Sequence, residues 1–368
     1  MSLTSPRGSV LGSAVLLSTS GASPVGSVDP ILLVDANNCL LRSFFAYPDL
    51  CAPDGVPTGA LYGVVNRIRE AVEKFQPSRV VACWDGGRAA WRRHVFSGYK
   101  DRPRSESSPD LSPCFAQWAP LRALLTAMGV DQIKVEGVEA DDLIAWFSLV
   151  PEAVCGDVVI LSTDRDFYQL VTDGAAATSV YYGITPKKGG VEHVTLETFR
   201  NATISATLPS GAEDPGEWAA YRVVNGDASD KIPGVRGLSG EKRWSSVYGT
   251  LCAMGYEGDG LDYFIGRDEV GVAGSFGAVV AENWELLQRN TILMSLPFAV
   301  GMLEQQRIDP AKHVEAGAWD ERAFKHAIAR YAFQSALSRW GEWRDTFRGL
   351  AERRMPWGVV SFGWLRCS

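Results

Sequence analysis

The chain has no paired cysteines and no long apolar run. Its seven cysteines are odd in number and form no CxxC motif, which argues against a disulfide framework and against a structural zinc site. This usage is typical of a reducing cytoplasm, where we expect the protein to act. No apolar stretch reaches the roughly 18 residues that a membrane span needs, so we expect no membrane partner. The cysteines are Cys39, Cys51, Cys83, Cys114, Cys155, Cys252 and Cys367.

An excess of positive charge is also missing. Lys and Arg number 36 against 43 Asp and Glu, which gives a formal net charge of -7. Binding to nucleic acid would therefore require local basic patches. An acidic total also fits a chain that concentrates carboxylates at one site and neutralises them with metal. The 368 residues are enough for one large domain or two medium ones.

The first 28 residues are rich in Ser and Gly. Arg7 followed by the apolar run VLGSAVLL loosely resembles a secretory signal peptide. Gly12 and Ser13 interrupt that run, and a single basic residue precedes it, which favours a disordered tail. We predict that residues 1–28 are not part of the fold.

Three short runs rich in Val, Ile and Leu each end at an aspartate. They are ILLVD ending at Asp35, RVVACWD ending at Asp85 and DVVILSTD ending at Asp164. Such runs are typical of parallel strands buried on both faces, and the intervening segments have helical periodicity. We predict an α/β fold with a mostly parallel central sheet flanked by helices. Ligands of such sheets bind beyond the carboxyl ends of the strands, so the three aspartates should meet at one crevice.

The pattern changes after about residue 200. Strand-like runs thin out, and helical segments alternate with Gly-rich turns such as GDASDKIPGVRGLSGEKRW. We predict an α/β domain over residues 29–200, a mainly helical domain over 201–345 and a C-terminal tail over 346–368.

Carboxylates recur in short, polar, Gly-flanked segments. Crowding so many anions requires cations, and carboxylate oxygens without His or Cys select hard ions such as Mg²⁺ or Mn²⁺. Asp164 and Asp166 in STDRD should point the same way from an extended backbone. The nine candidates are Asp35, Asp85, Glu139, Asp141, Asp142, Asp164, Asp166, Asp227 and Asp230.

The segment VEADD admits two interpretations. A helix that begins near Glu139 would tolerate these charges at its positive end, and Glu139 and Asp142 would share one face. Alone, the segment is equally compatible with a charged helix terminus and with a metal site. Together with the other carboxylates it favours the metal site.

Residues 87–104 form a local basic patch. Six basic side chains stand against one acid, and Trp91, Phe96 and Tyr99 are interleaved with them. Basic residues neutralise phosphates and aromatic rings stack on unpaired bases, although such a run can also be a solvated loop. Its position directly after Asp85 favours a segment that overhangs the site. The basic residues are Arg88, Arg92, Arg93, Lys100, Arg102 and Arg104.

The order of these motifs resembles the 5′-nuclease/flap endonuclease superfamily, in particular stand-alone bacteriophage and bacterial 5′-3′ exonucleases and the N-terminal nuclease domain of DNA polymerase I. The matching segments span about residues 30–300. Two departures are Ala36, where the family usually has Gly, and one extra residue between the glycines of GVRGLSGEK. The segments are DANNCLLR, CWDGG, YKDR, VEADD, STDRDFYQLV, GDASDKIPGVRG and RNTILMSLP.

The resemblance implies a PIN-like core, a helical arch over residues 86–113 and a helix-hairpin-helix-type (helix-three-turn-helix) module in a DNA-binding helical domain. It also implies two metal ions. One set of ligands would be Asp35, Asp85, Glu139 and Asp141. The other would be Asp164, Asp166 and Asp227, with Asp142 and Asp230 further out. Asp141 is the leading candidate to bridge the two ions, and Asp142 is the weakest candidate.

The resemblance assigns the basic residues as well. Lys100, Arg102 and Arg42 match catalytic positions. Arg88, Arg92, Arg93 and Tyr99 would contact DNA from the arch. The hairpin, where a K⁺ ion can bind in the family, would contact DNA through Lys231, Gly234, Arg236, Gly237, Gly240 and Lys242.

The implied function is a structure-specific 5′ nuclease that depends on Mg²⁺, with Mn²⁺ able to substitute. Its substrate would be DNA with a 5′ flap or 5′ single-stranded end, including RNA primers on DNA, in replication or repair, and we expect a monomer. One alternative is a PIN-type single-strand ribonuclease, which the downstream GDASD and glycine hairpin disfavour. Another is a non-catalytic DNA-junction binder, which the full set of nine carboxylates disfavours.

Overall fold

The protein is described by a computed structural model over residues 29–101, 109–150, 156–174, 176–183, 192–200, 208–257, 261–265, 267 and 271–355. The expected tail over 1–28 lies outside these residues. So do Arg102, part of the expected arch, and the last 13 residues of the chain.

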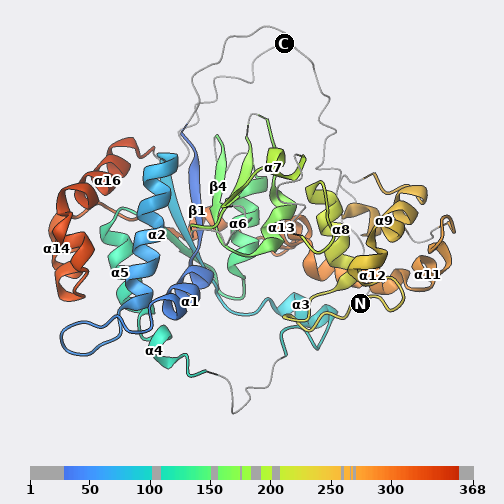
Figure 1. Ribbon diagram of the computed structural model, residues 1–368, viewed down its shortest axis with the longest axis horizontal. Helices are drawn as coiled ribbons and strands as arrows, with labels where there is room; N and C mark the ends of the chain where they lie inside the picture. Colours follow the sequence, from blue (N-terminus) through green and yellow to red (C-terminus); the bar gives the residue numbers. More distant parts are fainter. Residues whose placement is uncertain are drawn as a thin grey trace, which may run out of the picture.

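The described residues form one seven-stranded sheet in the order β6–β5–β4–β1–β2–β3–β7 (Figure 1). The five inner strands run parallel, and the two edge strands β6 and β7 run antiparallel to their neighbours. The predicted α/β class with a mostly parallel sheet is confirmed. The strands are β1 (Ile31–Asp35), β2 (Arg79–Trp84), β3 (Asp131–Lys134), β4 (Val158–Leu161), β5 (Thr178–Tyr181), β6 (His193–Val194) and β7 (Val314–Glu315).

Helices cover both faces of the sheet because its strands are apolar on both faces. In β1, Leu32 and Val34 pack toward α2, whereas Leu33 packs toward α6. The elements of this first part are α1 (Ala36–Ala46), α2 (Gly59–Phe75), α3 (Ala90–Val95), α4 (Ser112–Phe115), α5 (Trp118–Ala127), α6 (Ala140–Leu149), η1 (Arg165–Leu170) and α7 (Leu196–Arg200).

The following helices extend the α6 side of the molecule (Figure 1). Their apolar side chains join the same core as α6 and β1, so this helical region has no separate core. The close packing of α13 on α6 makes that connection. The elements are α8 (Pro215–Asn225), η3 (Glu241–Arg243), α9 (Trp244–Ala253), α10 (Asp262–Ile265), α11 (Gly277–Glu282), α12 (Trp284–Met294), α13 (Leu296–Gln305) and η4 (Pro310–His313).

The last three helices lie elsewhere than α8 and the helices that follow it. They are α14 (Glu321–Arg330), α15 (Gln334–Ser338) and α16 (Trp340–Arg353), and they lie beside α2 and α5 at the opposite end of the molecule from α8 and α9 (Figure 1). Phe324 and Phe347 are fully buried in the core on the α2 face. The chain past β7 therefore packs on the α/β part, and α16 continues through the residues predicted to begin a tail at 346.

None of the helices in the described residues combines the length and the apolar character needed to cross a membrane.

Candidate active site

Three predicted aspartates lie at the carboxyl ends of adjacent strands. Asp35 ends β1, Asp85 directly follows β2, and Asp164 follows β4 by three residues. The strand β1 pairs with both β2 and β4, so it lies at the point where the strand order reverses. That point is where parallel α/β sheets bind ligands, as the sequence predicted for these three residues.

Asp35 is buried and tightly held. It caps α1 by accepting a hydrogen bond from the Asn38 backbone at 3.2 Å, and it accepts a second from the Ser162 hydroxyl at 2.7 Å. The same hydroxyl accepts from the Asp164 backbone N–H at 3.0 Å. Burial, reinforced by Asp164 and Asp85, raises the pKa of Asp35 to about 7. Ser162 thus links two strand ends, a role that no motif indicated.

Asp85 reaches the start of α6 because Gly86 lets two loops touch. The Gly86 N–H donates to Val138 O at 2.8 Å, and a Cβ at Gly86 would lie 1.6 Å from Val135 O. Only glycine permits this approach. The Asp85 carboxylate consequently accepts from the Ala140 N–H at 2.8 Å, which caps α6 from another segment of the chain.

Asp141 faces the strand ends from the first turn of α6. Burial raises its pKa well above the usual value, and the neighbouring Asp35 and Asp164 add to the effect. Asp35, Asp85, Asp141 and Asp164 are called the strand-end group below. The two interpretations of VEADD therefore apply to different residues. Glu139 is the N-cap residue of α6, although its side chain makes no cap bond, whereas Asp141 belongs to the strand-end group.

Arg92 is a buried cation paired within the protein, and its contact with DNA stays a prediction. It is 3% exposed, and two of its nitrogens bind both oxygens of Asp142 at 2.9 and 2.7 Å. It also donates to Glu139 at 3.3 Å and to Leu293 O on α12 at 3.1 Å. Nε, Nη1 and Nη2 all donate within the protein, and the burial of the side chain leaves little surface for a phosphate. Both oxygens of Asp142 pair with Arg92, and its role as a metal ligand stays a prediction.

Tyr99 and Lys100 also contact Glu139. The Tyr99 hydroxyl and the Lys100 ammonium both donate to Glu139 Oε2 at 2.9 Å, and the ammonium lies 3.9 Å from Asp230 Oδ2. Tyr99 is 3% exposed and packs against Ile232 and α12, and its stacking on a DNA base stays a prediction. Lys100 remains partly exposed beside the carboxylates.

A second group of acids surrounds Arg222 in the last turn of α8. Arg222 Nη2 lies 2.8 Å from Asp166 Oδ1 and 2.6 Å from Asp227 Oδ2. These three residues are called the Arg222 group. Hydrogen bonds from Ser229 and the charge of Arg222 lower the pKa of Asp227, although burial alone would raise it. Asp166 differs: burial raises its pKa to about 7 despite Arg222, because it also faces Asp164 and Asp227. The sequence analysis missed Arg222, whose only signal was its place five residues before Asp227.

Asp141 of the strand-end group and Asp166 and Asp227 of the Arg222 group line one small cavity of about 30 Å³. Five carboxylates line it together with Arg92 and Tyr99, and apolar residues of α12 and α13 close it. Oxygen donors without imidazole or thiolate suit a hard cation. The carboxylates are Glu139, Asp141, Asp166, Asp227 and Asp230.

The carboxylates are nevertheless not preassembled as a metal site. In the described part of the chain, no group of three or more His, Cys, Asp or Glu side chains is arranged to hold a metal ion. Arg92, Lys100 and Arg222 take up oxygens of Glu139, Asp142, Asp166 and Asp227. The oxygen donors are of the type that a hard cation prefers, but basic side chains of the protein already neutralise some of these carboxylates.

The remaining predicted basic residues are exposed. Arg42 lies on α1, two turns from Asp35, and Arg88 and Arg93 lie on the segment that contains α3. Four hairpin residues between α8 and α9 are exposed as well: Lys231, Arg236, Gly240 and Lys242.

The hairpin glycines have different roles. Gly237 is exposed with φ of +91°, a conformation that favours glycine. A Cβ at Gly234 would lie 2.4 Å from Asn225 O, so this glycine allows the turn to pack on the end of α8. Gly234 therefore has a structural role in the turn, and its DNA contact stays a prediction.

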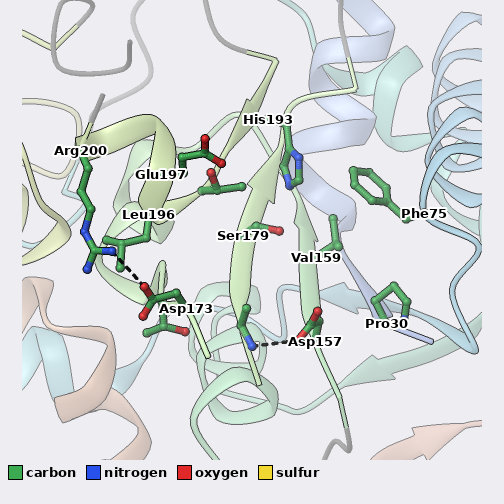
Figure 2. A pocket seen from close by; sticks show the side chains of 13 residues that line it. Pro30, Phe75, Asp157, Val159, Asp173, Ser179, His193, Leu196, Glu197 and Arg200 are labelled. Atoms are coloured by element: carbon green, nitrogen blue, oxygen red, sulfur yellow. Dashed lines mark hydrogen bonds and ion pairs between the residues drawn. The ribbon is translucent and has the colours of Figure 1, made fainter. Parts of the chain in front are cut away.

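A larger cavity of about 570 Å³ lies elsewhere in the protein (Figure 2). It extends over β4, β5 and β6 beside Phe75 at the end of α2, and none of the nine carboxylates lines it. Arg200 and Asp173 form an ion pair of 3.1 Å at its edge. Size alone does not make it the active site, because the convergent titratable groups lie elsewhere.

Comparison with known proteins identifies the family of this chain. The family model for the N-terminal, resolvase-like domain of 5′-3′ exonucleases matches residues 30–203. A 5′-3′ exonuclease of Streptomyces coelicolor is 31% identical over 220 residues, which cover 57% of this chain and 68% of that protein. One of Bacillus subtilis is 34% identical over 218 residues, which cover 58% and 67%. The chain belongs to the 5′-3′ exonuclease family of the 5′-nuclease superfamily, and it is a phosphodiester hydrolase.

Solved structures agree with this fold. The 5′-exonuclease of bacteriophage T5 with bound zinc has a TM-score of 0.55 at 18% identity and covers 82% of this chain and 99% of its own. The bacteriophage T5 flap endonuclease, in a pseudo-enzyme-product complex with DNA and metal ions, has a TM-score of 0.54 at 18% identity and covers 88% and 99%. At this identity the similarity concerns the fold.

Proposed function

We propose that the protein is a divalent-metal-dependent 5′ nuclease that cuts DNA at 5′ flaps and 5′ single-stranded ends. The observation that carries the proposal is the convergence of the strand-end group at the point where the strand order reverses. The T5 relatives, one with bound divalent metal and one in complex with DNA and metal ions, support the same reaction.

The carboxylates divide into two sets of cation ligands. Asp35, Asp85, Asp141 and Glu139 would hold one ion, and Asp164, Asp166 and Asp227 would hold the other. Asp230 would lie further out. When bound, two such cations activate a water for in-line attack on the phosphate and stabilise the leaving 3′-oxygen. Mg²⁺ is the expected ion because every donor is an oxygen.

The protein's own cations act on the substrate. Lys100 is partly exposed beside Glu139, so its ammonium can turn to the scissile phosphate and stabilise the charge that develops there. Arg42 and Arg102 would bind neighbouring phosphates. Lys231, Arg236 and Lys242 on the hairpin would hold the duplex, because exposed cations and backbone N–H groups bind phosphates without regard to sequence.

A panel of labelled substrates tests this function. With Mg²⁺, the protein should release short 5′ products from a DNA flap far faster than it cuts single-stranded RNA of the same length, and EDTA should stop the reaction. Preferred cutting of the RNA would instead indicate a single-strand ribonuclease. Tight flap binding without cleavage in either Mg²⁺ or Mn²⁺ would indicate a junction-binding protein.

A further inference from the structure

Arg222 is the cation at the site that no sequence motif singled out. Its side chain is 23% exposed, and it bridges acids from two separate segments: Asp166 in η1 and Asp227 in the turn after α8. A single nitrogen, Nη2, makes both contacts, at 2.8 and 2.6 Å. One positively charged atom therefore lies between two carboxylates that the proposed function assigns to a divalent cation.

The contact geometry of Arg222 differs from that of an arginine held for stability. Arg92 uses two nitrogens on the two oxygens of Asp142, the paired arrangement that gives arginine its strongest bonds. Arg222 shares one nitrogen between two acids, and among the described residues its buried Nε has no hydrogen-bond partner. Burying an unpaired donor is unfavourable. Electrostatic attraction to two carboxylates therefore explains the placement of Arg222 better than optimal hydrogen bonding does.

We propose that Arg222 is a positioning residue that stands in for a divalent cation. It holds Asp166 and Asp227 together when no cation is bound, and it competes with the cation for their oxygens. This inference rests on the proposed function, in which these two acids help to hold the second ion. It also explains why carboxylates that line one cavity are not arranged as a metal site.

Two consequences follow for the binding of cations. The ion held by Asp35, Asp85 and Asp141 should bind first and more tightly, because other carboxylates are the charged neighbours of Asp35 and outweigh Lys100 at Asp141. The second ion should bind more weakly, because its charge is added close to that of Arg222. Loss of Arg222 should therefore tighten the second site while loosening the metal-free fold.

Substitution of Arg222 separates this role from that of an ordinary ion pair. Mn²⁺ alone is the probe, with free Mn²⁺ followed by electron paramagnetic resonance and thermal unfolding recorded in parallel. In Arg222→Gln, affinity for the second Mn²⁺ should rise at least about tenfold, by removal of one like charge within a few ångströms. Its metal-free Tm should fall, and Mn²⁺ should raise that Tm by more than in the wild type.

Two matched variants complete the experiment. Arg222→Lys keeps the charge and should bind the second Mn²⁺ nearly as the wild type does. Arg339→Gln makes the same change in net charge at an exposed residue distant in sequence, and both its metal binding and its Mn²⁺-induced shift in Tm should match the wild type.

The outcomes distinguish the proposals. Wild-type affinity for both ions in Arg222→Gln would make Arg222 an ordinary structural cation and overturn this inference alone. Absence of Mn²⁺ binding in both the wild type and Arg222→Gln would overturn the proposed function as well. If Arg222→Gln unfolds without metal, recovery with Mn²⁺ supports the proposal, and failure to recover while Arg222→Lys binds two ions overturns it.

Discussion

The strand-end group and the Arg222 group hold the same kind of side chain in different electrostatic surroundings. In the strand-end group, burial and repulsion from Asp85 and Asp164 raise the pKa of Asp35 to about 7. In the Arg222 group, an arginine lies between Asp166 and Asp227, and the pKa of Asp227 is lowered despite burial. An arginine within one group lowers the pKa of Asp227, whereas the charged neighbours of Asp35 are other carboxylates. Asp166, which also faces Asp164, keeps a raised pKa like that of Asp35.

The difference shows that the number of carboxylates at a site is not the number that lack a basic partner. Nine carboxylates look equivalent in the sequence. In the structure, Asp142 is committed to Arg92, and Glu139 is shared among Arg92, Tyr99 and Lys100. In the strand-end group, neighbouring carboxylates help to raise the pKa of Asp35 and Asp141, so a bound cation should stabilise this group most. Five substitutions test these assignments.

Asp141→Asn should have the largest effect on activity. Cleavage of a DNA flap should fall by about 10³-fold or more, on the order of 4 kcal/mol, because Asp141 lies between the strand ends and the small cavity. Single-turnover rates at saturating Mg²⁺ would measure this. Asp345→Asn, on the exposed face of α16, is the matched control and should leave the rate unchanged. A loss of less than tenfold in Asp141→Asn would remove that residue from the reaction.

Arg92→Gln should have the largest effect on stability. It leaves Asp142 and Glu139 buried without their main cation, so the free energy of unfolding in urea should fall by about 3–5 kcal/mol. Arg93→Gln changes an exposed neighbour and should cost less than about 0.5 kcal/mol. Equal effects of the two substitutions would contradict the structural role of Arg92.

Asp35→Asn should change how stability depends on pH. The pKa of Asp35 is raised in the folded state, so below pH 7 the folded protein binds a proton that the unfolded chain releases above about pH 4. In metal-free protein its contribution is therefore full below about pH 4 and is lost as the pH rises toward 7, on the order of 2–4 kcal/mol. The asparagine variant should lack this loss when urea unfolding is compared at pH 5 and pH 8.

Asp227→Asn should change the pH dependence of stability in the opposite direction to Asp35→Asn. The pKa of Asp227 is lowered in the folded state, so its contribution is present at neutral pH and is lost as the pH falls below the ordinary aspartate value. The wild type should therefore be more stable than this variant at pH 7, and the difference should shrink in acid. If the stability contributions of Asp35 and Asp227 changed with pH in the same direction, the contrast between these two residues would be contradicted.

Lys242→Gln should have the smallest effect. The side chain is exposed on the hairpin, so its loss should weaken duplex binding equally for all sequences and reduce the salt slope by about one. Fluorescence anisotropy across a range of salt concentrations measures both quantities, with Lys312→Gln on η4 as the control. An unchanged slope would exclude Lys242 from the DNA interface.

The positions of the strand-end aspartates could be predicted because a short stretch of sequence is enough to identify each strand and its end. Asp35, Asp85 and Asp164 follow runs of buried β-branched residues, and parallel strands bring such ends to one edge. The start of α6 near Glu139 and its shared face with Asp142 were predicted for similar reasons: helix periodicity places residues three apart side by side.

The paired cations could not be predicted in this way. Arg92 and Arg222 look like surface residues by type, and their burial depends on partners 50 and 56 positions away in the sequence. The packing of α14 and α16 on α5 and α2 was missed for a related reason. An amphipathic pattern identifies the apolar face of a helix and leaves its partner undefined.

Anomalous diffraction from crystals soaked in Mn²⁺ tests the central claim most directly. If the strand-end group is the cation-binding centre of this nuclease, a strong peak should lie within ligand distance of the carboxylates of Asp35 and Asp141. That peak should be absent in Asp35→Asn crystals prepared in the same way. Mn²⁺-supported cleavage together with no peak at these residues, or with a peak that persists in Asp35→Asn, would contradict the claim.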